Sequence, residues 1–314
     1  MENNQARFCS IEAPCKINLH LAIGEKRPDG FHNLESIFAS LSLADSLTFE
    51  RCGKSSRLFV NWELPAEFIP KNPIPQEKNL ILRAVSLFQK ESGFKDGLEI
   101  HLIKRIPLGS GLGGGSSDAA STLLALNSLC DSPLPMEKLT CLALILGSDV
   151  PFFLKGGTAF VRGRGEKVEK TASPSGLWSL LVNPPFPSDT ASAFRLLDRA
   201  RKAGSLPFRT PIEQLSRGFL IQALKEAPES WPFFNDFLPL FLGKGEKSLV
   251  YQGILENLQK TGACFTGISG SGSCCYGIFD SKPRAEKAAK TLAVKGNITT
   301  LTFFLAQKPN AVVK

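Results

Sequence analysis

The stretch PLGSGLGGGSS at residues 107–117 is the feature of this 314-residue chain that decides its fold. Five of its residues, at positions 109, 111, 113, 114 and 115, are glycines. Before it, residues 98–103 alternate between apolar and polar side chains like a strand, and after it residues 116–130 carry an apolar stripe at helical spacing. The sequence therefore predicts a strand, a glycine-rich loop and a helix that Ser116 or Ser117 caps.

Such a loop suits an anion, because the free backbone N–H groups and the positive end of a helix dipole meet there without an intervening side chain. A dinucleotide-binding fold is disfavoured, since the helix leads into DSPLP at residues 131–135 instead of a second strand. No Gly-Lys-Ser/Thr follows the glycines, and no V-A-I-K strand or H-R-D loop is present, which excludes a P-loop and a protein-kinase loop. A close helix–strand contact without any ligand is the structural alternative.

Outside this loop, the patterns predict a mixed α/β chain. Residues 13–23 alternate like a strand with one polar face, which carries Lys16, Asn18 and His20. Helices are expected over 79–89 and over 137–146, where Gly147 ends the second. A change to shorter elements places a domain boundary near residue 155, giving domains 1–155 and 156–314, and residues 231–242 read as helix plus loop.

Composition limits the class of protein. With 43% hydrophobic and 21% charged residues and a mean hydropathy of -0.01, the chain is typical of a globular enzyme rather than a collagen-like, coiled-coil or disordered protein. No apolar run approaches the roughly 18 residues of a membrane span, and residues 1–10 lack a secretory pattern, so we expect a cytoplasmic protein without a membrane partner. The eight scattered cysteines indicate free thiols, and three dispersed histidines make no recognisable zinc site.

A net charge of +8 and a pI near 9.1 favour an anionic partner: nucleic acid, an acidic membrane surface or a phosphorylated small molecule. The basic residues are mostly dispersed, and no Lys/Arg-rich run is interleaved with aromatics. This distribution modestly favours a phosphate-bearing metabolite.

Two further motifs accompany the glycine loop: PCKINL at residues 14–19 and TGISGSGS at residues 266–273. In this order the three resemble the motifs of the GHMP small-molecule kinases, and the resemblance covers nearly the whole chain. It implies two α/β domains with the active site in the cleft between them. The N-terminal domain would resemble domain 2 of ribosomal protein S5 and the C-terminal domain would be ferredoxin-like, with the last strand able to return to the N-terminal domain. The S5 resemblance also raises the alternative of an RNA-binding module.

The resemblance implies an ATP-dependent kinase in which Lys16 and Asp149 form the catalytic pair. Phosphoryl transfer needs a carboxylate that orients or deprotonates the hydroxyl and a cation that keeps this carboxylate ionised. ATP would come with Mg²⁺, for which Ser117 is a possible ligand. The residues that would contact ATP are Asn79, Lys104, Pro107, Leu108, Gly109, Ser110, Gly111, Leu112, Gly113, Gly114, Gly115, Ser116 and Ser117.

Within the family, the segments PDGFH at 28–32, GSDVPF at 147–152 and ISGSG at 268–272 are similar to those of kinases of the non-mevalonate isoprenoid pathway. Their substrate is a cytidine diphosphate-linked methylerythritol, phosphorylated on its 2-hydroxyl. The implied contacts are a cytosine ring between Phe31 and Phe194 with His32 at its edge. Asn18, Thr190, Gly270, Ser271 and Gly272 would contribute to the same site. Another GHMP kinase, acting on homoserine or a mevalonate derivative, is the alternative within the family, and we expect a monomer or weak homodimer.

Overall fold

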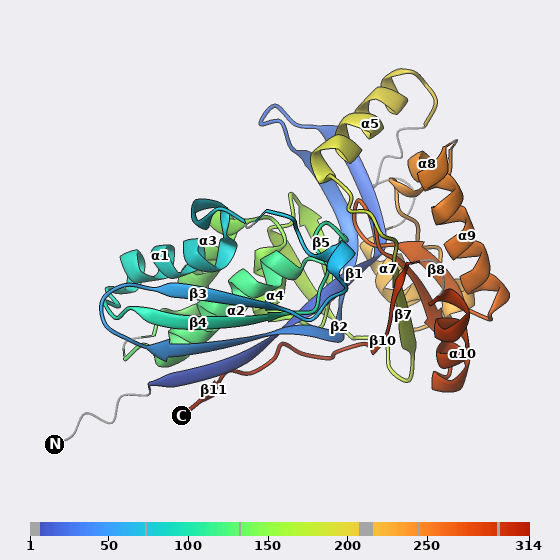
Figure 1. Ribbon diagram of the computed structural model, residues 1–314. Coiled ribbons are helices and arrows are strands. Elements are labelled where there is room, and N and C mark those ends of the chain that lie inside the picture. Colours follow the sequence, from blue (N-terminus) through green and yellow to red (C-terminus); the bar gives the residue numbers. More distant parts are fainter. Residues whose placement is uncertain (1–6, 73, 132, 207–215, 244, 294–295) are drawn as a thin grey trace.

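Two β-sheets organise the chain, one in each half (Figure 1). The computed structural model describes residues 7–314 except 73, 132, 207–215, 244 and 294–295. Within these residues, no helix is long and apolar enough to cross a bilayer. All eight cysteines are free thiols.

The first sheet has seven strands, in the order β11-β1-β2-β4-β3, with β5 hydrogen-bonded to β2 and β6 to β5. All neighbouring strands are antiparallel except β3 and β4, which run parallel. The strands are β1 (Phe8–Lys26), β2 (His32–Arg51), β3 (Arg57–Trp62), β4 (Leu98–Lys104), β5 (Thr158–Gly163), β6 (Lys167–Thr171) and β11 (Val312–Val313).

Four helices cover one face of this sheet (Figure 1). Their apolar side chains pack with those of the strands into a single core, to which Phe38, Phe88 and Phe152 each contribute a buried ring. The helices are α1 (Leu80–Ser92), α2 (Gly114–Leu129), α3 (Met136–Leu146) and α4 (Val150–Lys155), and two short 3-10 turns, η1 (Ala66–Phe68) and η2 (Gln76–Lys78), precede α1.

The second sheet is antiparallel, in the order β10-β7-β9-β8, and α9 and α10 pack against it. In chain order these strands follow the 4-1-3-2 arrangement of a ferredoxin-like fold. The elements are β7 (Trp178–Asn183), α5 (Thr190–Lys202), α7 (Arg217–Ala223), η3 (Pro228–Ser230), α8 (Leu238–Phe241), α9 (Glu246–Lys260), β8 (Phe265–Ile268), β9 (Cys275–Phe279), α10 (Lys282–Leu292) and β10 (Ile298–Phe303).

Strand β1 carries the polar face expected from the sequence, and the structure shows that this face is covered. Lys16, Asn18 and His20 are all buried, because β1 lies at the junction of the two halves. A second core joins Ile17 of β1 to Tyr276 of β9, and the Tyr276 hydroxyl donates to the Asn18 carbonyl at 2.9 Å. The polar side chains of β1 therefore face the interior of the molecule.

The predicted boundary at residues 155/156 falls between α4 and β5. Beyond it, β5 and β6 complete the first sheet before the chain enters the second at β7. At the other end of the chain, β11 returns to pair with β1 (Figure 1).

One local expectation is corrected. Helix α2 begins at Gly114, earlier than expected, and its N-cap is Gly113 with φ +73°; neither Ser116 nor Ser117 caps it. The segment 231–242 is helix plus loop, as expected, with α8 as its helix. Asn235 forms a parallel bridge with Leu21 of β1, so the preceding residues lie extended along the junction.

Candidate active site

Lys16 of β1 and Asp149, which are 133 positions apart in the sequence, meet in the structure. The Lys16 ammonium lies 3.5 Å from Asp149 Oδ2, and the two side chains are 4% and 32% exposed. Asp149 precedes the short helix α4 and makes no capping hydrogen bond to it. Its partly exposed carboxylate is therefore available to a bound molecule.

Buried contacts fix the position of Lys16. Its ammonium donates to Asn18 Oδ1 at 2.6 Å and lies 4.6 Å from the centre of the Phe38 ring. The Asn18 amide in turn donates to Ser36 Oγ at 3.0 Å. This chain of contacts leaves Lys16 little rotamer freedom, so the ammonium is held next to Asp149.

The glycine loop contacts Lys16 directly. A Cβ atom at Gly113 would lie 3.2 Å from Lys16 Cε and 2.9 Å from the Phe153 ring, so only glycine fits without displacing these groups. The Lys16 backbone N–H also donates to the Leu112 carbonyl at 2.9 Å. The expected catalytic pair and the expected phosphate loop are thus in direct contact through Lys16.

The start of α2 provides free hydrogen-bond donors. In the described part of the chain, no backbone carbonyl accepts a hydrogen bond from the N–H groups of Gly114, Gly115 or Ser116. These three donors stand at the N-terminus of a 16-residue helix, where the helix dipole favours negative charge. The loop and helix end therefore have the properties that a phosphate group requires.

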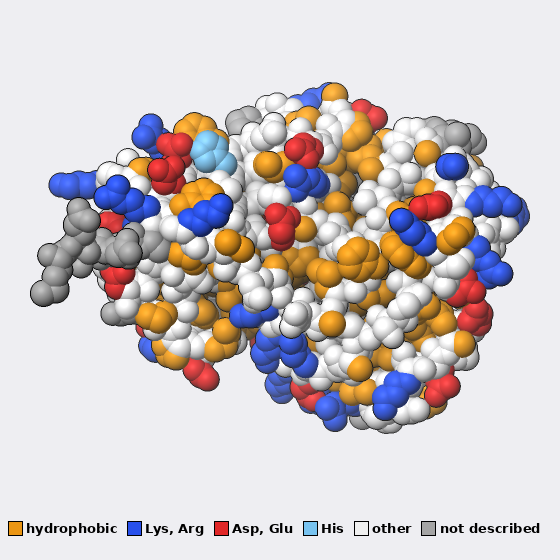
Figure 2. Space-filling model, turned by 90° about the horizontal axis from the view of Figure 1, so that it is seen from below, with side chains coloured by type: hydrophobic (Ala, Val, Ile, Leu, Met, Phe, Trp, Pro, Cys, Tyr) orange, Lys and Arg blue, Asp and Glu red, His pale blue; other side chains and the backbone are white. Residues whose placement is uncertain are grey.

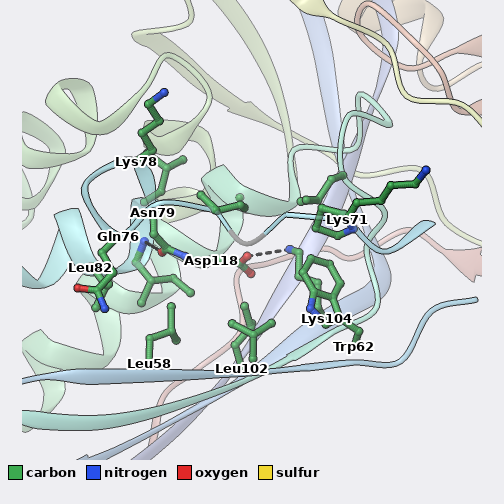
Figure 3. A pocket seen from close by; sticks show the side chains of 17 residues that line it. Leu58, Trp62, Lys71, Gln76, Lys78, Asn79, Leu82, Leu102, Lys104 and Asp118 are labelled. Carbon is green, nitrogen blue, oxygen red and sulfur yellow. Dashed lines mark hydrogen bonds and ion pairs between the residues drawn. The ribbon is translucent and has the colours of Figure 1, made fainter. Parts of the chain in front are cut away.

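A cavity of about 620 Å³ lies beside the loop (Figure 3). Its wall is largely apolar, which suits a flat nucleobase, and it includes the expected residues Asn79, Lys104, Leu108 and Gly115. Asn79 Oδ1 accepts the Ile81 backbone N–H at 2.9 Å and so caps α1, which leaves its amide NH₂ for a ligand. Additional lining residues are Leu58, Val60, Trp62, Lys71, Gln76, Leu80, Leu102 and Asp118.

Lys104 is paired with two carboxylates that sequence reasoning missed. Its buried ammonium contacts Asp45, and it donates to Asp118 Oδ2 at 2.7 Å, as Figure 3 shows for Asp118. Burial alone would lower the pKa of Lys104, but the two carboxylates outweigh it and raise that pKa. Burial raises the pKa of Asp118 to about 7, and the neighbouring Asp45 adds to the shift against the opposing effect of Lys104. Asp118 follows Ser117 directly, so its place after the loop was the available signal.

The aromatic side of the cleft differs from expectation. Phe31 is 49% exposed, but the His32 ring stacks on Phe194 with centroids 4.9 Å apart and planes inclined by 22°. His32 Nε2 is 2.8 Å from Asp198 Oδ1, a partner on α5 that the sequence did not reveal. His32 is therefore packed against Phe194 instead of standing at the edge of a slot between two phenylalanines.

The third motif closes the site from the second half. A Cβ atom at Gly111 would lie 2.1 Å from the Ser269 carbonyl oxygen, so the two glycine-rich turns touch through their backbones. At Gly270, whose φ is +56°, the nearest atoms include the Gly111 carbonyl oxygen and Asn18 Oδ1. Thr190 and Ser271, both expected at the site, have hydroxyl oxygens 3.0 Å apart. Gly272, also expected there, follows in the same turn.

Ser117 does not fit as a metal ligand. Its side chain is fully buried, and its hydroxyl donates to the Pro14 carbonyl at 2.7 Å. In the parts of the chain that the structure describes, no group of three or more His, Cys, Asp or Glu side chains could hold a metal ion.

Known protein families and relatives match most of the chain. Residues 79–157 match the model of the GHMP kinases N terminal domain, and residues 212–297 match that of the GHMP kinases C terminal domain. A 4-diphosphocytidyl-2-C-methyl-D-erythritol kinase of Treponema pallidum is 37% identical over 287 residues, covering 90% of this chain and 94% of that protein. One of the same name from Burkholderia thailandensis is 38% identical, covering 89% and 88%.

Solved structures extend the comparison. A crystal structure of 4-(cytidine 5′-diphospho)-2C-methyl-D-erythritol kinase matches with a TM-score of 0.72 and 31% identity, covering 93% of this chain and 98% of the other. A homoserine kinase from Cytophaga hutchinsonii has a TM-score of 0.70 but only 18% identity, covering 99% of each chain, and so supports the fold alone. The two-domain α/β fold expected from the sequence is thereby confirmed.

Proposed function

The chain belongs to the GHMP kinase family and is an ATP-dependent small-molecule kinase, and from this premise we propose that it phosphorylates 4-diphosphocytidyl-2-C-methyl-D-erythritol on its 2-hydroxyl. The reaction would belong to the non-mevalonate route to isoprenoid precursors. The observation that carries the proposal is the Lys16–Asp149 pair, 3.5 Å apart and in contact with the glycine loop. The identity to kinases with this substrate in their name supports the choice of acceptor.

Asp149 is proposed to orient the acceptor hydroxyl and to accept its proton as the oxygen attacks the γ-phosphorus of ATP. The Lys16 ammonium pairs with this carboxylate and adds positive charge where the transferred group collects negative charge, and Asn18 Oδ1 holds the ammonium in place. Since phosphoryl transfer depends mainly on position and electrostatics, holding these groups beside the glycine loop is the main contribution expected from the protein.

The ATP phosphates are proposed to bind the free N–H groups at residues 114–116, and the base to occupy the cavity that Asn79 and Leu108 line. The ammonium of Lys104 is paired with Asp45 and Asp118. We therefore assign Lys104 a supporting role in the wall of the nucleobase pocket instead of a direct contact with ATP. Mg²⁺ would neutralise charge on the ATP phosphates. With Ser117 hydrogen-bonded to Pro14, we assign that ion no protein ligand.

The cytosine is proposed to bind near Phe31, whose ring is half exposed, and against the stacked pair of His32 and Phe194. Thr190 and the turn at residues 270–272 would border the alcohol end, where Asn18 approaches Gly270. Stacking on flat rings suits a pyrimidine, whereas the small aliphatic substrates homoserine and mevalonate offer no base to stack.

We also propose a cytoplasmic enzyme, monomeric or weakly dimeric, that acts without nucleic acid or membrane. Figure 2 bears on nucleic acid alone: on the face that it shows, Lys and Arg side chains are interspersed with Asp and Glu. Strong RNA binders instead concentrate positive charge in a continuous patch.

A coupled assay of ADP release tests the proposal across three acceptors: the diphosphocytidyl alcohol, homoserine and mevalonate phosphate. We expect turnover with the first alone. Turnover with homoserine or mevalonate phosphate, but not with the cytidine compound, would move the protein to another branch of the family. Salt-sensitive RNA retention without ADP release would favour the RNA-binding alternative.

A further inference from the structure

The turn between β5 and β6, residues 163–166, lies between the two ends of the proposed acceptor site. On one side, a Cβ atom at Gly165 would lie 2.5 Å from the Ser148 carbonyl oxygen, so the turn packs against the residue that precedes Asp149. On the other side, the Arg164 guanidinium lies 4.5 Å from the centre of the Phe31 ring. Two neighbouring residues of this turn thus contact the segment before Asp149 and the Phe31 ring.

The Arg164 guanidinium has no polar partner in the described part of the chain. No ion pair and no side-chain hydrogen bond joins it to another described residue, and its side chain is half-buried. Asp29 is the acidic group whose pKa it helps to lower, but Asp29 is already paired with Arg27 at 3.0 Å. Its guanidinium N–H groups are therefore available as donors to a bound anion.

Other arginines near the cleft are occupied. Arg162 pairs with Glu169 at 2.6 Å, and the buried Arg201 pairs with Asp236 at 3.0 Å. Arg164 is instead directed by its backbone, because its N–H donates to the Glu166 carboxylate at 2.5 Å and fixes the turn. The Arg164 guanidinium therefore lies over the Phe31 ring without a carboxylate paired to it in the described part of the chain.

We infer that Arg164 binds the diphosphate of the acceptor substrate, a contact that rests on the function proposed above. A molecule with cytosine near Phe31 and its hydroxyl at Asp149 must place two phosphates between them, where this guanidinium lies. The planar fork of an arginine matches phosphate oxygens with paired hydrogen bonds, which a lysine cannot reproduce. The glycine loop binds the donor's phosphates, and Arg164 binds those of the acceptor.

Binding of cytidine 5′-diphosphate and of cytidine, measured by calorimetry, tests the inference without turnover. The variants are Arg164→Met and Arg164→Lys, and Lys167→Met is the matched control, because it removes one positive charge from the exposed neighbouring strand. We expect Arg164→Met to weaken binding of the diphosphate by roughly 10- to 100-fold and that of cytidine by less than about 3-fold. Arg164→Lys should recover part of the loss, and the control should match the wild type.

Three results would overturn the inference. Equal losses for cytidine and its diphosphate would make Arg164 a stacking partner of Phe31 only. Unchanged diphosphate affinity in a folded Arg164→Met protein, or a loss of the same size in Lys167→Met, would remove the specific contact. KM for the diphosphocytidyl alcohol separates the two proposals. If the wild-type protein turns this substrate over and Arg164→Met has the same KM, the Arg164 contact alone is refuted. If the wild-type protein does not turn it over, the proposed function is refuted first.

Discussion

Asp149 is the residue whose replacement tests the proposed chemistry most directly. Its carboxylate is one-third exposed and makes no cap to α4, so Asp149→Asn should leave the fold intact. We expect kcat to fall roughly 100-fold or more while ATP affinity stays close to wild type, because general-base catalysis contributes about that much. Steady-state kinetics and nucleotide titration measure both. Full activity in this variant would exclude Asp149 from the reaction.

Gly113 tests the phosphate loop at the same scale. Gly113→Val places a side chain at φ +73° and against Lys16 Cε and Phe153, so we expect ATP affinity to fall at least about 10-fold. Gly253→Ala is the control, since Gly253 lies in α9 with open space around it. Unchanged nucleotide binding in Gly113→Val would argue that ATP does not approach the loop.

Asp118 gives a pH-dependent prediction. Burial is the main cause that raises its pKa from the ordinary value of an aspartate to about 7 in the folded state, so between these two pKa values the folded protein binds a proton that the unfolded chain has lost. Stability from this group is therefore greatest at low pH and declines as pH rises through about 7. Relative to wild type, Asp118→Asn should gain on the order of 2 kcal/mol in unfolding free energy between pH 5 and pH 8. A difference that is flat with pH would contradict the prediction.

At the scale of elements, the segment after η3 links the third glycine-rich turn to β1 through Asn235. The Asn235 amide donates to the carbonyls of Ile268 and Gly270 at 3.0 and 2.9 Å, and its oxygen accepts the Phe237 N–H at 2.9 Å. Together with its bridge to Leu21, this one side chain ties the third glycine turn to β1. The segment therefore holds the glycine-rich turn at residues 268–272 in position against β1.

Replacement of Asn235 by alanine leaves buried carbonyls without a donor. We expect Asn235→Ala to lower the unfolding free energy by on the order of 2 kcal/mol and to raise KM for the acceptor more than KM for ATP. Asn257→Ala is the control, because the Asn257 amide donates to a carbonyl on the exposed face of α9. Chemical denaturation reports stability, and an effect no larger than that of the control would deny Asn235 this role.

Local patterns predicted most elements of the fold. The helix expected at 79–89 is observed at Leu80–Ser92 with Asn79 as its cap, and the helix ended by Gly147 is observed at Met136–Leu146. The polar face of β1 was predicted, but its burial was not, because alternation reports which side chains share a face and not whether water or another domain covers it. The helix and loop of segment 231–242 were predicted, but their role was not, because the loop's hydrogen bonds run to Leu21 and Gly270, far away in sequence.

The side chains that contact the predicted site residues were the least predictable part of the candidate site. The three motifs indicated Lys16, Asn18 and the glycine loop, and the structure brings these together. The side chains that hold others in place, such as Asp198 beside His32, carry no motif of their own. A single polar residue on a helix such as α5 looks like any solvated residue until its neighbour across the fold is known.

At the scale of the whole molecule, the Tyr276 hydroxyl is one of the groups that join the two halves. Tyr276 of β9 donates to the Asn18 carbonyl, next to a register shift in the pairing of β1 with β2. Tyr276→Phe should cost on the order of 1–3 kcal/mol, the penalty for an unsatisfied buried acceptor. Tyr251→Phe is the matched control, since the Tyr251 hydroxyl makes no hydrogen bond within the described residues. Equal melting temperatures for the two variants would contradict this assignment.

The backbone contact between Gly111 and Ser269 has a thermodynamic consequence. It presses the loop proposed for the donor onto the turn proposed for the acceptor, with no flexible side chain between them to absorb a displacement. Binding of one substrate should then change the affinity for the other. Thermodynamic linkage requires the two effects to be equal: if bound ATP raises the affinity for the acceptor by some factor, bound acceptor raises the affinity for ATP by the same factor. The enzyme would favour the ternary complex over either half-filled state.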